Sequence, residues 1–131
     1  MKKVYTPRAP EPGGHYEQGV ISSGMLYISG QLPVNPVNPE IRITGFREQV
    51  LQVLQNIDAV LEAAGASREQ VVRTTVYITD IALWPEVNRM YADFFGDHRP
   101  ARTVVPVKEL HYGYKIEMDA VAELLNTGDE L

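Results

Sequence analysis

The sequence predicts an α+β fold in which two helices pack on one face of a mixed sheet of five or six strands. Short runs of β-branched or alternating apolar residues, bounded by turn residues, predict the strands. Two longer segments, residues 46–64 and 85–95, repeat apolar side chains at helical steps and predict the helices. The order strand–strand–(strand)–helix–strand–helix–strand–strand is typical of a sheet whose helices lie on one side.

The N-terminal part is expected to form an arm, a hairpin and a loop. Prolines and paired glycines predict an irregular arm over residues 1–14, and residues 20–22 and 25–29 flank a Ser-Gly turn and predict a hairpin. Three prolines after residue 32 predict a loop, and residues 40–43 are expected to add a short edge strand. The 131 residues predict one domain, with a frayed polar tail at 126–131.

The first helix has the clearest periodicity, with Thr44 as the expected N-cap and Gly65 as the C′ residue. The second half begins with a Ser67–Gln70 capping box and a β-branched strand at 71–78. Pro85 is expected at N1 of the second helix.

Two further strands, residues 101–107 and 115–122, are expected to pair as an antiparallel hairpin. Arg102 lies at the start of the first, and a guanidinium is costly to bury without an anionic partner. That partner is either a protein carboxylate or the carboxylate of a ligand. Glu117, on the polar face of the second strand, would come near Arg102 in such a hairpin and offers a structural salt bridge as the alternative.

Charge and composition argue against several classes of protein. The formal net charge is -5, which disfavours nucleic acid, and cysteine is absent, so thiol chemistry is excluded. No apolar run approaches the ~20 residues of a membrane span, and no signal peptide is evident, so a cytoplasmic protein is expected. The histidines have no metal-ligand spacing, so no metal site is expected. Apolar residues on both faces of the central strands predict an oligomer interface.

Eight short segments together resemble the RidA/YjgF family of reactive-intermediate (imine) deaminases. They are Tyr16–Gly19, Ser29–Pro33, Glu62–Ser67, Val72–Tyr77, Val87–Asn88, Tyr91–Phe95, Pro100–Thr103 and Lys115–Ala122. The resemblance implies a chorismate-mutase-like homotrimer with sites between subunits. It also implies hydrolysis of 2-imino acids, such as 2-iminopropanoate and 2-iminobutanoate, to 2-oxo acids and ammonia without a cofactor.

The resemblance also assigns roles. Arg102 would bind the substrate carboxylate and Glu117 would position the attacking water, and the residues expected to line or support the cleft are Tyr16, Ser29, Gly30, Asn88 and Val104. From the residues alone, Tyr16 is interpreted as a packed aromatic of the arm and Ser29 as the end of a strand.

The chain departs from the family pattern near these positions. Val104 stands where many members have cysteine, Pro106 where glutamate is common, and His15 where proline precedes the tyrosine. The Leu-Pro-Lys loop of many members is replaced by Leu110–Tyr112, and Tyr114 follows. These changes leave the arginine and glutamate intact and put the substrate range in question.

Two alternatives remain beside the small imino acids. One is a larger catabolic enamine, such as an aminomuconate-type compound, which is suggested by the changed residues at the mouth of the expected cleft, His15, Tyr112 and Tyr114. The other is a trimer that binds a small carboxylate as a regulatory module without catalysis.

Overall fold

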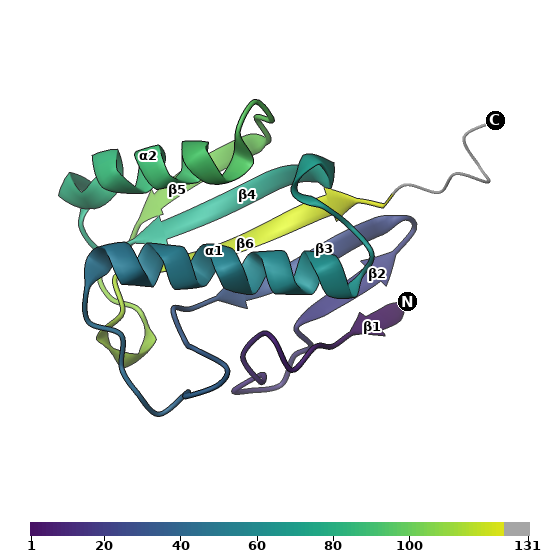
Figure 1. The fold of residues 1–131 in the computed structure, drawn as a ribbon, viewed down its shortest axis with the longest axis horizontal. Coiled ribbons are helices and arrows are strands. Elements are labelled where there is room, and N and C mark those ends of the chain that lie inside the picture. The colour runs from purple at the N-terminus through teal and green to yellow at the C-terminus, as the bar shows by residue number, and fades with distance from the viewer. Residues whose placement is uncertain (125–131) are drawn as a thin grey trace.

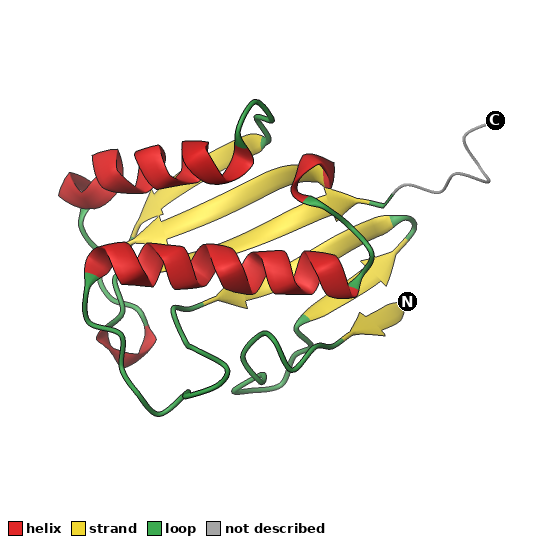
Figure 2. Cartoon of the chain, in the orientation of Figure 1, coloured by secondary structure: helices red, strands yellow, loops and turns green. Residues whose placement is uncertain are grey.

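The computed structural model describes residues 1–124, so the tail expected at 126–131 lies outside the described residues. The strands are β1 (Lys2–Val4), β2 (Gly19–Ser22), β3 (Met25–Gln31), β4 (Val71–Ile78), β5 (Ala101–Pro106) and β6 (Ile116–Glu123). The helices are α1 (Phe46–Ala63) and α2 (Trp84–Phe95), with single 3-10 turns at Arg68–Gln70, Ile81–Leu83 and His111–Gly113. Both helices lie on the same side of the sheet (Figures 1 and 2), which confirms the predicted fold class.

The sheet has the order β1-β2-β3-β6-β4-β5. All neighbours are antiparallel except β4 and β5, which run parallel and are joined through α2. The predicted hairpin of β5 with β6 is therefore wrong. A helical crossover makes β5 parallel to β4, and β6 pairs with β3 on one side and β4 on the other.

The sixth strand is also elsewhere than predicted. Residues 40–43 form no strand, whereas Lys2–Val4, expected to be irregular, pairs with β2 at the edge of the sheet. The rest of the arm, from Tyr5 to Gly14, contains no helix or strand.

Local signals at the helix ends are mostly confirmed. The N-cap of α1 is Gly45 rather than Thr44, and it makes no side-chain cap bond. Gly65 follows the C-cap with φ of 76°, as expected for a C′ glycine. The capping box of Ser67 with Gln70 is present. Pro85 lies in the first turn of α2 but at N2 rather than N1, because the helix begins at Trp84.

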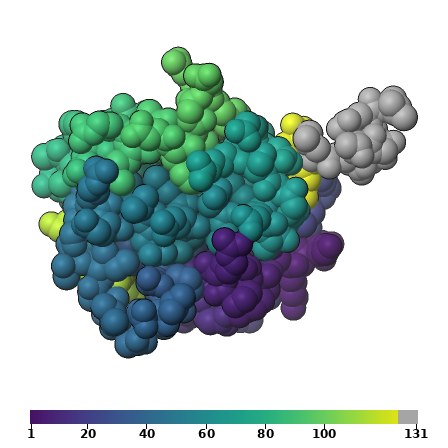
Figure 3. Space-filling view, viewed as in Figure 1, coloured from purple at the N-terminus to yellow at the C-terminus, as the bar shows by residue number. Residues whose placement is uncertain are grey.

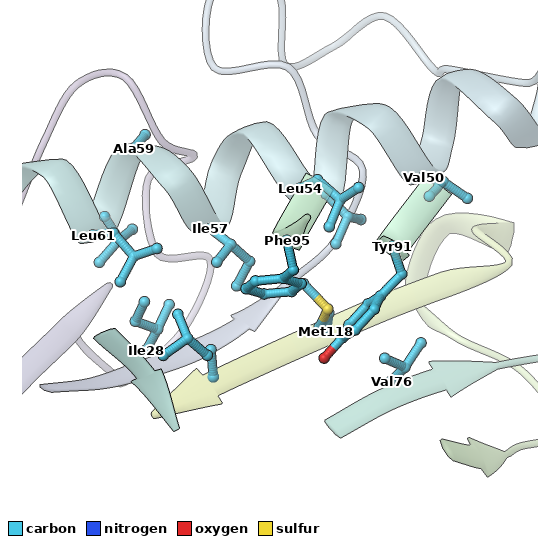
Figure 4. Packing of buried hydrophobic residues seen from close by; sticks show 14 of the residues in the cluster. Ile28, Val50, Leu54, Ile57, Ala59, Leu61, Val76, Tyr91, Phe95 and Met118 are labelled. Carbon is cyan, nitrogen blue, oxygen red and sulfur yellow. The ribbon is translucent and has the colours of Figure 1, made fainter. Parts of the chain in front are cut away.

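The core lies between the helices and the sheet. Figure 4 shows side chains of both helices meeting those of β3, β4 and β6, among them Ile57, Phe95 and Met118. The opposite face of the sheet mixes half-buried apolar residues such as Val105 and Val121 with polar ones such as Asp119, whereas the sequence predicted a more apolar face.

Candidate functional site

Arg102 lies on the helix side of β5, opposite Thr74 of β4. Its guanidinium carbon is 4.6 Å from the ring centroid of Trp84 and 4.9 Å from that of Tyr91. Its Nη1 donates a 3.0 Å hydrogen bond to Oδ1 of Asn88. Trp84, Asn88 and Tyr91 recur along one face of α2, so this helix presents an aromatic and amide platform to the arginine.

The charge of Arg102 has no carboxylate partner on this platform. The ion pairs found within residues 1–124 are Lys3–Glu17, Arg8–Glu62 and Arg68–Asp58. The predicted salt bridge of Arg102 with Glu117 is therefore not formed within one chain. A stacked, exposed guanidinium whose neutral partner is an amide keeps in-plane donors for an external anion.

Glu117 lies on the other face of the sheet. It alternates along β6 with buried Ile116 and Met118, so its side chain points away from the helices. The pairing of β3 with β6 shifts register between Ile28 and Gln31, and a Cβ added to Gly30 would overlap Oε2 of Glu117. Glycine therefore leaves the space that the carboxylate occupies.

The environment of Glu117 favours its protonated form. Burial raises the pKa of this carboxyl above its usual value, the charge of His111 opposes the rise, and Asp119 adds to it. A carboxyl that is half-buried and titrates closer to neutrality suits proton transfer.

A cavity of about 500 Å³, here called the loop cleft, opens beside Gly30. Three stretches of chain line it. The arm contributes Pro10, Glu11, Gly13, Gly14, Tyr16 and Gln18; β3 and the loop after it contribute Gly30, Gln31, Leu32, Val34, Pro39 and Arg42; the β5–β6 connection contributes His111, Tyr112 and Tyr114. Figure 1 shows these stretches converging along the lower edge of the view, and Figure 3 shows the arm packed beside the blue segment after β3.

Buried side-chain amides hold these stretches in place. Gln18 is 1% exposed; its Oε1 accepts from the Thr6 amide at 2.7 Å, and its Nε2 donates to the carbonyls of the arm. Asn56 of α1 donates to the carbonyls of Leu32 and Val34. Each side-chain amide thus bonds backbone groups that have no strand or helix partner in these irregular segments.

Gln49 is the third such amide and ties two stretches together. It donates to the carbonyl of Ile43 at 3.1 Å and accepts from the amide of Lys115 at 2.9 Å. Sequence reasoning missed these amides. Their only signal was the position of Gln49 and Asn56 within the strongly periodic helix, where a buried polar residue requires a partner.

The other predicted site residues divide between scaffold and cleft. Ser29 donates from its hydroxyl to the carbonyl of Glu17 at 2.7 Å and so holds β3 to the arm. Tyr16 is half-exposed in the cleft wall, where its hydroxyl accepts from the amide of Gly13. Val104 packs against the core from the helix side of β5. His15, expected to shape the mouth, is not among the lining residues in the described part of the chain.

The structure does not bring Arg102 and Glu117 together within one chain. Arg102 is opposite Thr74 and Glu117 opposite Tyr77, so β4 separates their strands. Strand spacing and rise place their Cα atoms roughly 14 Å apart, with the side chains on opposite faces. The candidate site thus has two parts: Arg102 with Asn88, and Glu117 with Gly30 and the loop cleft.

Within residues 1–124, no group of three His, Cys, Asp or Glu side chains is placed to hold a metal ion. None of the helices in this part of the chain is both long and apolar enough to cross a membrane.

Comparisons with known proteins are consistent over nearly the whole chain. A family model described as Endoribonuclease L-PSP matches residues 6–124. A RutC family protein of Aquifex aeolicus is 46% identical over 124 residues, which cover 93% of this chain and 98% of that protein.

Solved structures agree with the sequence matches. The YjgF gene product of E. coli has a TM-score of 0.88 and 39% identity, covering 94% of this chain and 98% of its own. E. coli TdcF, solved with bound serine, has a TM-score of 0.90 and 36% identity, covering 95% of this chain and 100% of its own.

Proposed function

Since this chain belongs to the RidA/YjgF family, whose family model is described as Endoribonuclease L-PSP, we propose that it is a deaminase of 2-imino and enamino acids. It hydrolyses them to 2-oxo acids and ammonia. The observation that carries the proposal is the half-buried Glu117 carboxyl, which has a raised pKa and lies against Gly30, a residue in the wall of the loop cleft.

The proposed reaction uses the two parts of the site for different tasks. Arg102 binds the substrate carboxylate through paired hydrogen bonds and so fixes the adjacent C=N carbon. Glu117 accepts a proton from water as the water oxygen bonds to that carbon. That proton is delivered to nitrogen, which gives a carbinolamine. Glu117 then moves the hydroxyl proton of the carbinolamine to the same nitrogen, the C–N bond breaks, and ammonia leaves as the C=O bond of the 2-oxo acid forms.

A small imino acid cannot span the two parts of one chain, because Arg102 and Glu117 lie roughly 14 Å apart at their Cα atoms. We therefore include in the proposal that Arg102 of one copy completes the site around Glu117 of another, as in the homotrimer that the resemblance implies. The unpaired outer edge of β5 and the helix-free face of the sheet support such an assembly.

The related TdcF protein was solved with bound serine. Serine carries a carboxylate and a nitrogen on adjacent atoms, as a 2-imino acid does, and this supports the substrate class. It also supports the alternative of a non-catalytic module that binds a small amino or oxo acid. Glu117 favours chemistry, because holding a carboxylate requires only the arginine.

The first test measures ammonia and 2-oxo-acid release from freshly generated 2-iminopropanoate and 2-iminobutanoate. We expect acceleration by the wild type and a loss of about 100-fold or more in Arg102→Ala, because a charge-assisted bidentate contact is removed. An Arg102→Ala protein with full activity would overturn the assignment. Serine binding without any acceleration of imine hydrolysis would favour the non-catalytic alternative.

A further inference from the structure

The loop cleft begins beside the Glu117 carboxyl, which contacts its wall residue Gly30, and its other walls lie on different segments of the chain. Gly30, which contacts Glu117, lies in one wall, and Arg42 and Tyr112 lie in others. The volume of about 500 Å³ falls in the range of cavities that hold ligands much larger than a three-carbon acid. The space beyond Gly30 therefore has room for a second group on the substrate.

Arg42 supplies an unneutralised charge to that space. Its Nη1 donates to the carbonyl of Tyr112, and its guanidinium carbon lies 4.7 Å and 5.4 Å from the ring centroids of Tyr112 and Tyr114. None of the ion pairs within residues 1–124 involves Arg42. Glu11, the carboxylate of the cleft wall, is contacted instead by the hydroxyl of Tyr5.

The aromatic support of Arg42 is held in place by its surroundings. Tyr114 is 3% exposed, so its ring is buried, and the ring of Tyr112 meets it edge-on with centroids 6.3 Å apart. Tyr112 has φ of 65° and ψ of 15°, a left-handed conformation that is uncommon for a bulky residue. Strained conformations of this kind gather at ligand sites, where the surrounding structure maintains them.

We propose that Arg42, supported by Tyr112 and Tyr114, binds the distal carboxylate of a dicarboxylic imino or enamino acid. This rests on the proposed function, since it names the substrate class of the same site. Stacking occupies the faces of the guanidinium and leaves its in-plane N–H groups for a carboxylate. Arg102 then takes the carboxylate beside the reacting carbon, Arg42 takes the far one, and Glu117 acts between them.

The test compares stable 2-oxo acids, the product class, in pairs of equal chain length. Calorimetry gives the Kd of 2-oxoglutarate against 2-oxopentanoate, and of 2-oxoadipate against 2-oxohexanoate, for wild type, Arg42→Gln and Arg47→Gln. Arg47 lies exposed in the first turn of α1 and provides the same charge change away from the cleft.

We expect the wild type and Arg47→Gln to bind one diacid at least about tenfold more tightly than its monoacid partner. In Arg42→Gln the preference falls to about twofold or less, while monoacid binding stays within about twofold of wild type. Equal binding of both members of each pair, or a preference that survives in Arg42→Gln, would overturn the proposal. If no imine is hydrolysed but the diacid preference depends on Arg42, the deaminase fails and the subsite stands.

Discussion

Glu117 is a carboxyl whose pKa is raised in the folded chain, the reverse of the usual case for a glutamate. The folded protein therefore retains this proton to a higher pH than the unfolded chain, whose glutamates titrate near ~4.3. As pH rises through this interval, charging Glu117 lowers the free energy of unfolding. Charged Glu117, which the proposed reaction needs, therefore lowers the stability of the folded protein at neutral pH.

We expect Glu117→Gln to have a higher Tm than wild type at pH 7, with the two values converging below about pH 4. The amide keeps the shape and removes the buried charge. Melting curves from pH 3 to 8, at one protein concentration, test this. A variant that is less stable than wild type at pH 7 would mean that the charged form makes a stabilising contact.

Gly30 is the backbone that contacts this carboxylate. In Gly30→Ala the new Cβ overlaps Oε2 of Glu117, and the flexible side chain must move away. We expect kcat/KM for 2-iminobutanoate to fall by about 100-fold, because a displacement of this size misplaces the base, while Tm changes little.

Gly45 provides the matched control for that substitution. A Cβ at Gly45 would overlap Oε1 of Glu48 in the same way, at the start of α1 and outside the loop cleft. Gly45→Ala should therefore keep kcat/KM within about twofold of wild type. Equal losses in the two variants would show that crowding, rather than the position of Glu117, explains the effect.

At the scale of elements, α2 positions Arg102 through Asn88 and two rings. We expect Asn88→Asp to raise the KM for 2-iminobutanoate by about tenfold or more, because its carboxylate competes with the substrate for the guanidinium. Asn88→Ala, which only removes the 3.0 Å hydrogen bond, should raise KM less and change kcat little. Steady-state kinetics separate the two parameters.

Gln55→Glu is the control for added charge, since Gln55 is exposed on α1. It should leave KM unchanged. An Asn88→Asp protein with the KM of Asn88→Ala would indicate that Asn88 acts through shape alone and that Arg102 does not bind the substrate carboxylate.

The elements also show what the sequence could and could not predict. The helices were predicted because their signal is local: the apolar spacing of α1 and the glycine after it lie within one segment. Lys2–Val4 has no such signal, because two of its residues are lysines and it is a strand only through pairing with β2. The predicted pairing of β5 with β6 is wrong because these strands are consecutive in sequence but are separated by β4 in the sheet.

In the candidate site, too, features with a local sequence signal were predictable and features made by distant segments were not. Arg102 and Glu117 were selected by residue type and motif, and each lies in an exposed or half-buried position suited to its proposed task. Other features of the site depend on contacts between segments that are distant in sequence. These features are the separation of the two residues by β4, the loop cleft, and the supporting amide of Gln49. No periodicity in a single segment reports such contacts.

At the scale of the whole molecule, the separation of Arg102 from Glu117 makes assembly testable by complementation. We expect Arg102→Ala and Glu117→Gln each to be inactive alone. When the two are unfolded together in equal amounts and refolded, activity should return to about a quarter of wild type. Half of the copies then supply an intact arginine and half supply an intact glutamate. Because a site needs both, about a quarter of the sites are complete.

Refolding each variant by itself is the control and should restore nothing. A mixture that stays inactive, although both variants assemble, would place Arg102 and Glu117 of one site in the same chain. Sedimentation of the same samples shows whether mixed assemblies formed.

The position of β6 also has a consequence for how the molecule is made. On a ribosome the chain emerges from its N-terminus, yet β6, the last strand within residues 1–124, is the one that joins β3 to β4. Until it emerges, the early hairpin and the β4–α2–β5 unit have no strand pairing between them. Sheet closure therefore waits until β6 has emerged, and until then the nascent chain exposes unpaired strand edges.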